Sequence, residues 1–191
     1  MRIYGDSISG NCLKVKWVCD YLNRPYQWVE TNVLKAESRT AEYLAMNPAG
    51  QVPAVVLDDG RPLAQSNAIM LHLAEGSDLI PADAYDRAKM FEWLFWEQYS
   101  HEPYVAVARF QMHYLGNTVE PRIMERGRGA LKLMDQALAQ TPFLVGNRAC
   151  LADVALVAYT RVAHEGGFDL ADFPAVQAWV SRVEAAVGIS A

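Results

Sequence analysis

The chain has 191 residues, of which 52% are hydrophobic and 20% are charged; this is the composition of a globular protein and excludes a disordered chain. The length accommodates one large domain or two small ones. With 17 basic and 22 acidic residues the net charge is −5, which argues against a nucleic-acid-binding module, because such modules are usually basic.

The first 77 residues predict short strands that alternate with helices. The strands are predicted at residues 2–4, 26–32, 52–57 and 62–64. The helices are predicted at residues 13–22, 38–46 and 66–75. The turn Asp58-Asp59-Gly60 joins the last two strands as a hairpin. The resulting order, β-α-β-α-β-β-α, is thioredoxin-like and predicts a mixed sheet of four strands with an antiparallel hairpin at its end.

Residues 84–191 have no strand-like alternation and predict a bundle of about five helices. These helices are predicted at residues 84–99, 103–115, 122–140, 151–165 and 174–187. Pro103 predicts a kink between the first two, and residues 78–83 are expected to link the two domains. The predicted fold class is α+β: a thioredoxin-like βαβαββα domain at residues 1–77, followed by an all-α helical bundle domain at residues 84–191.

The motif Ser9-Gly10-Asn11-Cys12 lies where the first strand meets the first helix. The N–H groups at a helix N-terminus favour an anion at such a place. The Ser9 hydroxyl can donate a hydrogen bond to a bound thiolate and so lower the pKa of that thiol; the alternative is that Ser9 only caps the helix. Asn11 fits either role. For Cys12 we favour a small buried residue over a nucleophile.

Two further loops have properties of a ligand site. In residues 47–53, a cis bond between Val52 and Pro53 would expose the backbone of Val52 to a peptide ligand, and the alternative is a tight turn without a ligand. Ser66, after Gln65, begins a helix whose N-terminus can accept a carboxylate, and the alternative is capping alone. We expect all three loops at one edge of the sheet, an arrangement typical of a small-molecule site.

Four stretches of the chain resemble the glutathione S-transferase superfamily. They are SGNCLKV (residues 9–15), NPAGQVPAV (47–55), QSNAI (65–69) and FLVGNRACLADVAL (143–156). In this order and at this spacing they extend the resemblance over nearly the whole chain, and they imply the fold of that superfamily. A serine that is followed by Asn11 is similar to the bacterial theta-like and nu-like groups, which are of the serine type.

The resemblance implies a glutathione site on the first domain. Ser9 would hold the glutathione sulfur as a thiolate, with help from Asn11. Val52 would pair through its backbone with the cysteinyl part of glutathione, and Pro53 would be cis. Glutathione is expected as a co-substrate, and no metal is expected.

The two carboxylate ends of glutathione would lie at other residues. Gln65 and Ser66 would hold the γ-glutamyl end, although relatives commonly have a glutamate where Gln65 stands. A histidine that often contacts the glycyl carboxylate in close relatives is replaced by Ser38. Arg39 or Gln51 would take over this contact, because a guanidinium is a good partner for a carboxylate.

The resemblance also implies an electrophile site and a dimer. The electrophile would lie between the domains, near Ile8 and against the second-domain helix that carries His101, Tyr104 and Ala108. A homodimer is expected, with neither nucleic acid nor a membrane as a partner. The aromatic-rich residues 91–99 are interpreted as core and dimer interface.

The second domain contains a helix cap, Cys150-Leu151-Ala152-Asp153, in which a cysteine stands where the family usually has serine or threonine. Asp153 is expected to play a structural role by accepting backbone N–H bonds. The reciprocal hydroxyl is expected to be missing, and the loss of such a cap typically costs about 1 kcal/mol.

The function that follows is a glutathione transferase, which activates glutathione as a thiolate and conjugates it to small apolar electrophiles. One alternative is a glutathione-dependent disulfide or peroxide reductase on the same fold, using Ser9 and Asn11 or Cys12. Another is a non-catalytic binding protein. The three scattered cysteines, the lack of a long apolar segment and the lack of a signal-like start predict a cytoplasmic location.

Overall fold

A computed structural model describes residues 1–189 of the chain. The chain divides into two compact units, Met1–Ser77 and Asp78–Ala191. Residues 78–83, which the sequence suggests as a linker, therefore belong to the second unit. Leu79 explains this placement: its side chain is buried there, and its carbonyl accepts a hydrogen bond of 3.0 Å from the backbone N–H of Leu151.

The first unit is built on a four-stranded mixed sheet in the order β2-β1-β3-β4. Its strands are β1 (Arg2–Gly5), β2 (Gln27–Glu30), β3 (Ala54–Val56) and β4 (Pro62–Ala64). Strand β1 runs parallel to β2 and antiparallel to β3, and β3 pairs antiparallel with β4. This topology confirms the predicted thioredoxin-like arrangement and its terminal hairpin.

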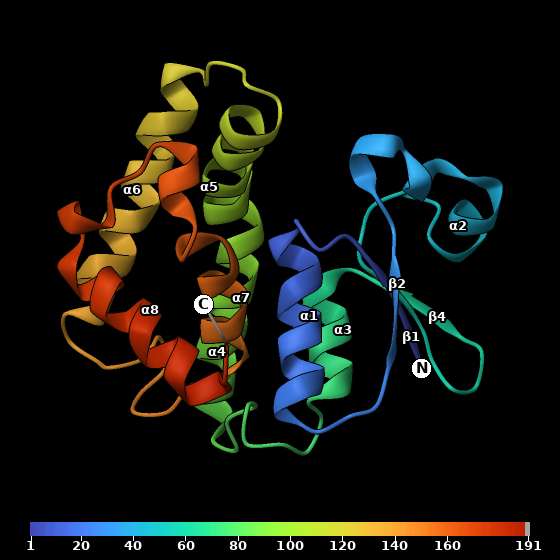
Figure 1. Cartoon of the computed structure of the whole chain (residues 1–191). Helices are drawn as coiled ribbons and strands as arrows, with labels where there is room; N and C mark the ends of the chain where they lie inside the picture. The colour runs from blue at the N-terminus through green and yellow to red at the C-terminus, as the bar shows by residue number, and fades with distance from the viewer. Residues whose placement is uncertain (190–191) are drawn as a thin grey trace. The chain divides into compact units, whose positions relative to one another are not determined.

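Three α-helices cover the sheet. They are α1 (Gly10–Tyr21), α2 (Ala41–Met46) and α3 (Ser66–Leu73). Helices α1 and α3 pack against each other on one face of the sheet, and α2 lies on the other face (Figure 1). The predicted helix at 38–46 is divided: a 3-10 turn, η2 (Glu37–Arg39), precedes α2, because Thr40 leaves the helical conformation and caps α2 by accepting a bond from the N–H of Tyr43. The turn η1 (Val33–Lys35) was not predicted.

The register of the sheet brings three strand ends to one edge. Tyr4 lies opposite Ala54, and Ala54 lies opposite Ala64. Because β3 is antiparallel to both neighbours, the carboxyl ends of β1 and β4 and the start of β3 share this edge. The three loops that the sequence analysis singled out follow or precede these ends, so they gather there as expected. Tyr4 itself is a core residue and packs edge-on against Tyr43.

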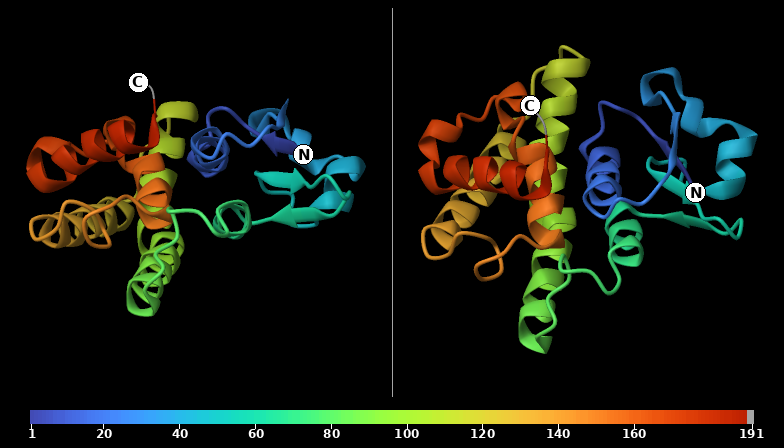
Figure 2. Two further views of the ribbon diagram at one scale, coloured as in Figure 1. Left: turned by 90° about the horizontal axis from the view of Figure 1, so that it is seen from below. Right: turned by 60° about the horizontal axis from the view of Figure 1, so that its bottom comes forward.

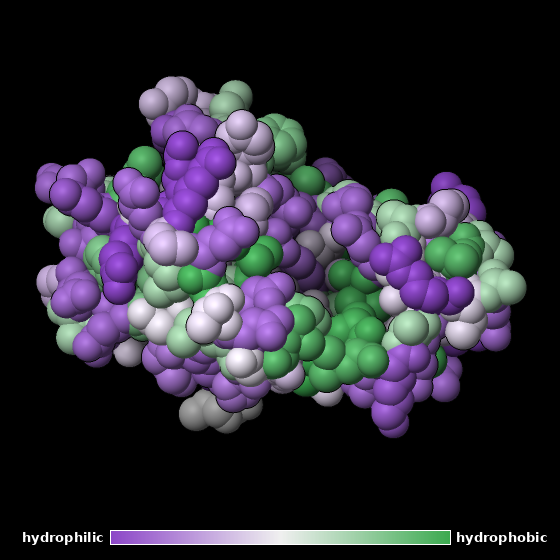
Figure 3. All heavy atoms as spheres, turned by 90° about the horizontal axis from the view of Figure 1, so that it is seen from above, coloured by the Kyte–Doolittle hydropathy of each residue, from purple (hydrophilic) through white to green (hydrophobic). Residues whose placement is uncertain are grey.

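The second unit is helical. Its helices are α4 (Ala84–Trp96), α5 (Glu102–Arg109), α6 (Pro121–Leu138), α7 (Leu151–Thr160) and α8 (Pro174–Val187). All ten residues of α7 are buried, as is typical of a helix at the centre of a bundle. The predicted helix at 151–165 thus ends at Thr160, and the short 3-10 turns η5 (Ala163–Gly166) and η6 (Leu170–Asp172) lead to α8. On the face drawn in Figure 3, hydrophilic residues predominate on the surface of this unit.

The two helices predicted on either side of Pro103 form one continuous column (Figure 2). Between α4 and α5 lies a π-helical segment, η3 (Glu97–His101), and a second one, η4 (Phe110–Tyr114), follows α5. Proline lacks a backbone N–H and its ring would clash with the carbonyl four residues earlier. The wider π-helical turn before Pro103 accommodates the proline while the chain stays helical. Among the described residues, no helix is long and apolar enough to span a membrane.

The cap of α7 is intact, which corrects the sequence-based expectation that its reciprocal partner is missing. The Cys150 sulfur takes the place of the hydroxyl opposite the N–H of Asp153, and the N–H of Cys150 donates to Asp153 Oδ2 at 2.9 Å. Asp153 Oδ1 accepts two more bonds, from the N–H of Leu144 (2.9 Å) and from Trp179 Nε1 (2.8 Å). Asp153 is fully buried, and desolvation raises the pKa of its carboxyl.

Candidate functional site

The loop between β1 and α1 is held by carboxylates on both sides. Asp6 is buried, and its side chain accepts bonds from the N–H of Ile8 (3.0 Å) and the N–H of Val33 (2.7 Å). Glu30 accepts bonds from both the N–H and the hydroxyl of Ser7. These contacts fix the backbone that leads to Ser9. Neither acid was identified from the sequence. The bond from Ile8 to Asp6 is a local Asx turn that a sequence pattern can indicate, whereas the bond from Val33 to Asp6 joins residues far apart in the chain.

Ser9 is the N-cap residue of α1, but only through its backbone. Its φ and ψ of −89° and 117° are extended, and its side chain makes no capping bond. The hydroxyl instead forms a hydrogen bond with the Cys12 side chain. Ser9 is half-buried. Ser9 therefore caps α1 through its backbone and not through its hydroxyl, and the hydroxyl lies beside the Cys12 sulfur.

Cys12 has no exposed surface, which confirms the interpretation as a small buried residue. Its sulfur accepts a bond of 3.4 Å from the N–H of Asp6. Burial raises the pKa of the Cys12 thiol to about 12, although the bond from Ser9 acts in the opposite direction. Cys19 and Cys150 are buried free thiols as well. Because the thiolate is the reactive form, a buried and protonated thiol is a poor nucleophile.

This burial leads to a direct expectation for chemical modification. At pH 8 a thiol with a pKa of about 12 is a thiolate to roughly one part in 10⁴. In the native protein, none of the three cysteines should react with a disulfide reagent in the minutes that free glutathione needs, and all three should react in urea. Rapid reaction of one thiol equivalent in the native protein would contradict the assigned burial.

The second loop presents Val52 next to a firmly held carbonyl. The Val52–Pro53 peptide bond is cis, as the sequence analysis considered. The carbonyl of Gln51, one residue earlier, accepts two bonds of 2.7 Å, from the Tyr43 hydroxyl and from Asn47 Nδ2. These two side chains determine the course of the backbone into Pro53. Neither was singled out from the sequence, although Asn47 also forms a local Asx turn with the N–H of Ala49 that its position before Pro48 favours.

Arg39 lies over the same loop. Its Nη1 donates to the carbonyl of Ala49 at 3.2 Å. Gly50 has a φ of +62°, a backbone conformation that favours glycine, and a Cβ atom there would come within 2.6 Å of Arg39 Nη1 and displace the guanidinium. Arg39 and Gln51 are exposed, whereas Ser38 is buried. The cation at this loop is therefore Arg39, while Ser38 belongs to the interior.

The third loop enters α3 in a strained conformation. Gln65 has a φ of +68° and a ψ of 110°, which is unfavourable for a residue with a Cβ. Such strain is usually retained where the surrounding structure requires one geometry. Its side chain is exposed and makes no capping bond. Ser66 is buried at the first turn of α3, and its hydroxyl donates to Asn11 Oδ1 at 3.1 Å. This bond connects the third loop directly with the first.

Comparison with known proteins follows the same division of the chain. Residues 8–75 match the family model of the glutathione S-transferase N-terminal domain, and residues 97–186 match that of the C-terminal domain. The chain is 31% identical to glutathione S-transferase theta-1 from Rattus norvegicus, over 98% of this chain and 84% of that protein. The chain belongs to the glutathione S-transferase family.

Two solved bacterial glutathione S-transferase structures are also similar. One, from Xanthobacter autotrophicus Py2, has 49% identity and a TM-score of 0.94, and the alignment covers 99% of this chain and 95% of that one. The other, from Pseudomonas fluorescens Pf-5, has 46% identity and a TM-score of 0.92, with coverage of 96% and 94%. These similarities confirm the fold predicted for this family member. All three loops described above lie within the segment that matches the N-terminal domain model.

In the helical unit of this glutathione S-transferase family member, the residues expected near the electrophile have different surroundings. His101 is fully buried, and its Nε2 lies 3.0 Å from Thr160 Oγ1. Because the Thr160 hydroxyl donates its proton to the carbonyl of Leu156, it accepts from His101. Ala108 is fully buried too. Tyr104 is half-buried and lines a pocket in this unit. Of the three residues expected to contact the electrophile on this helix, Tyr104 is the one with exposed surface. His101 and Ala108 are buried and pack in the interior of the helical unit.

No group of three or more His, Cys, Asp or Glu side chains that could hold a metal occurs within residues 1–189.

Proposed function

We propose that this protein binds glutathione at the sheet edge of its first unit, activates it as a thiolate through Ser9, and conjugates it to small apolar electrophiles. The observation that carries this proposal is the Ser9 hydroxyl, which makes no capping bond and stands at a helix N-terminus beside a buried sulfur. A hydroxyl in that place can donate to a thiolate of the ligand once it turns from Cys12.

The remaining parts of glutathione fit the other two loops. The backbone of Val52 pairs with the cysteinyl residue of the ligand. Arg39, already directed to the loop at Ala49, and Gln51 hold the glycyl carboxylate. The γ-glutamyl carboxylate lies at the N-terminus of α3, where Ser66 and the first N–H groups of the helix favour an anion. Gln65 adds an uncharged hydrogen-bond partner to this end.

The reaction then needs little from the protein beyond the thiolate and a place for the electrophile. The hydrogen bond from Ser9, assisted by Asn11, favours the thiolate over the thiol and lowers the pKa of bound glutathione. The sulfur attacks an electrophilic carbon, a carbon–sulfur bond forms, and the leaving group departs with its electron pair. Tyr104 of the helical unit is the proposed contact of the electrophile, and His101 and Ala108 are buried residues of the same helical column.

Calorimetric titration with glutathione, combined with a conjugation assay on a generic aryl halide, tests this function. We expect saturable heat and glutathione-dependent turnover. Absence of both at millimolar glutathione would favour the non-catalytic binding protein. Heat without conjugation, together with glutathione-dependent reduction of a disulfide, would favour the reductase. A Cys12→Ser variant that retains full activity in either assay excludes the Cys12 route, as the burial of Cys12 leads us to expect.

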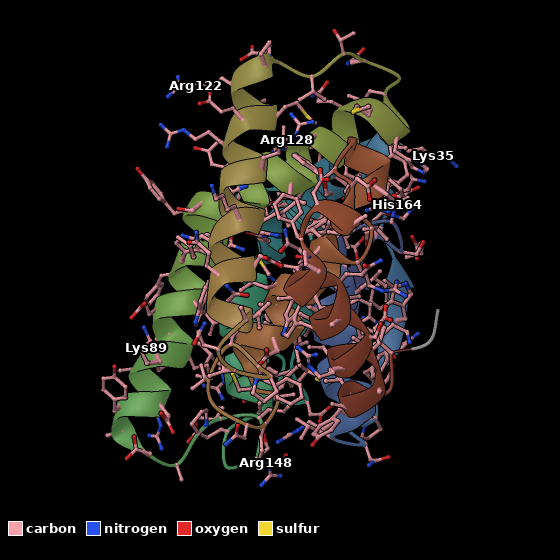
Figure 4. The ribbon with its side chains drawn as sticks, turned by 90° about the vertical axis from the view of Figure 1, so that its left-hand side faces the viewer. Lys35, Lys89, Arg122, Arg128, Arg148 and His164 are labelled. Carbon is pink, nitrogen blue, oxygen red and sulfur yellow. The ribbon has the colours of Figure 1, made fainter. Side chains whose placement is uncertain are left out.

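We also propose that the protein is a homodimer and that α4, η3 and α6 form the contact between copies. Phe95 and Tyr99 are 71% and 84% exposed, which is unusual for large aromatic side chains. Tyr99 and Leu133 border a pocket of about 660 Å³. Arg122, which extends from the first turn of α6 (Figure 4), lines the same pocket. Large exposed aromatic side chains on one face suit contact with a second copy, because a two-fold symmetric dimer pairs the same surface of both chains.

Sedimentation equilibrium tests the dimer. The wild-type protein should sediment at twice the mass of one chain, and Tyr99→Glu should shift the dimer constant by at least tenfold, since it places a charge in the contact. The matched control is Leu34→Glu on the first unit, where an apolar side chain is also largely exposed; it should leave the mass unchanged. A Tyr99→Glu protein that remains fully dimeric at low micromolar concentration would contradict the assigned face.

A further inference from the structure

The hydrogen bond between Ser66 and Asn11 joins two parts of the proposed site that bind different ends of the ligand. Its partners are 55 residues apart in the sequence, and the Ser66 hydroxyl donates to Asn11 Oδ1 at 3.1 Å. Ser66 begins α3, and Asn11 lies in the first turn of α1. Helices α1 and α3 pack side by side (Figure 1). A change at one helix N-terminus can therefore be felt at the other through a single bond.

The chemistry of a hydroxyl makes this bond exclusive. A serine hydroxyl has one proton, so it donates one full hydrogen bond at a time. In this structure the proton of Ser66 is directed to Asn11. A carboxylate that binds at the N-terminus of α3 and accepts from the Ser66 hydroxyl must take that same proton. Binding of the carboxylate and the bond to Asn11 therefore compete.

We propose that the Ser66–Asn11 bond couples recognition of the γ-glutamyl carboxylate to the readiness of Asn11 at the thiol. The inference rests on the proposed function. In this structure the Ser66 hydroxyl donates to the Asn11 amide oxygen. When the ligand carboxylate takes the Ser66 proton, Asn11 loses this bond, and its amide can present its N–H₂ group to the ligand sulfur. Asn11 thus acts as a positioning residue between the two subsites, and a thiol without a γ-glutamyl end leaves the Ser66–Asn11 bond in place.

The coupling has a consequence that a purely supporting role for Asn11 would not have. Removal of the Asn11 side chain leaves the Ser66 proton without this competing acceptor. A ligand that carries the γ-glutamyl end but no thiol makes no thiol contact with Asn11 that the variant could remove. In the variant, this ligand also no longer has to break the Ser66–Asn11 hydrogen bond. Such a ligand should bind more tightly to Asn11→Ala than to the wild-type protein. If Asn11 merely held Ser66 in place, the same variant should bind it more weakly.

A double-mutant cycle with S-methylglutathione, followed by calorimetry, tests the coupling. Asn11→Ala is expected to bind this probe about three- to tenfold more tightly than wild type, the range of one neutral hydrogen bond. Ser66→Ala is expected to bind it more weakly. In the Ser66→Ala background, Asn11→Ala should change the affinity by less than about twofold, because the competing bond is already absent. Alanine suits the first turn of a helix, so the fold should persist.

Three results would contradict the proposed coupling. An Asn11→Ala protein whose affinity is unchanged or reduced overturns the coupling. Tightening that persists in the Ser66→Ala background also overturns it, since the gain would then come from space near the methyl group. Wild-type protein that binds neither glutathione nor S-methylglutathione at millimolar concentration would overturn the proposed function itself, and the coupling with it.

Discussion

Replacement of Ser9 by alanine is expected to raise the pKa of the glutathione thiol in the complex by about one to two units, because a hydrogen bond to a charged group contributes about 1.5–3 kcal/mol. The thiolate of glutathione loses its hydrogen-bond donor, whereas the thiol loses little stabilisation. The equilibrium therefore shifts toward the protonated thiol. At neutral pH the conjugation rate should fall by about 10- to 100-fold, and the rate should recover as the pH rises toward the new pKa. Ultraviolet absorbance of the thiolate against pH measures the midpoint directly.

The loop offers a matched control in Ser7. This serine is two residues earlier and exposed, and its hydroxyl donates to Glu30 rather than to a sulfur. Ser7→Ala should leave the thiol pKa within about 0.3 units of wild type, the scale of a distant surface change. An equal midpoint for wild type and Ser9→Ala would remove Ser9 from the mechanism. Equal shifts in both variants would point to a general disturbance of the loop instead.

Asp153→Ala is expected to lower the free energy of unfolding by about 3–5 kcal/mol, since it leaves three buried N–H donors without their acceptor. The donors are the backbone N–H groups of Leu144 and Cys150 and the Trp179 ring N–H. Asp153→Asn retains an oxygen for two of them and should lose about 1–3 kcal/mol. Urea unfolding followed by tryptophan fluorescence measures both variants, and the asparagine variant provides the comparison if the alanine variant does not fold.

The matched control is Asp169→Ala, which removes an exposed acidic cap, that of η6. It should cost about 0.5–1 kcal/mol, as expected for a cap at the surface. If Asp153→Asn and Asp169→Ala cost the same, the buried carboxylate does not organise the second unit as described.

The pH dependence of the Asp153 contribution has a defined sign. Burial raises the pKa of the Asp153 carboxyl above its ordinary value of 3.8, so the folded protein holds the proton more tightly than the unfolded chain does. The contribution of this group is then fully present below the ordinary pKa and decreases as the pH rises through the raised folded pKa. The difference in unfolding free energy between wild type and Asp153→Asn should therefore decrease with rising pH over that interval. An increase would contradict the raised pKa.

Local patterns in the sequence predicted most of the elements of this fold. The apolar run at residues 52–57 predicted β3, and Asp58-Asp59-Gly60 predicted its hairpin to β4. The motifs at Ser9, at Val52–Pro53 and at Gln65–Ser66 were each identified as possible ligand loops, because each combines a helix start or a proline with polar residues. Two expectations were wrong. At Pro103 the chain does not break into two helices but continues through a π-helical turn. At Cys150 the cap was expected to lack its reciprocal partner, and the cysteine sulfur provides it.

The sequence by itself thus determined the types and order of the elements and three separate loops, because these depend on interactions between residues close in the chain. The tertiary structure alone decided how the loops work together. The register through Tyr4, Ala54 and Ala64 aligns them, and the bonds from Val33 to Asp6 and from Ser66 to Asn11 connect residues 27 and 55 positions apart. Such pairings arise only when packing brings distant segments together, and no local pattern of polar and apolar residues encodes which donor meets which acceptor.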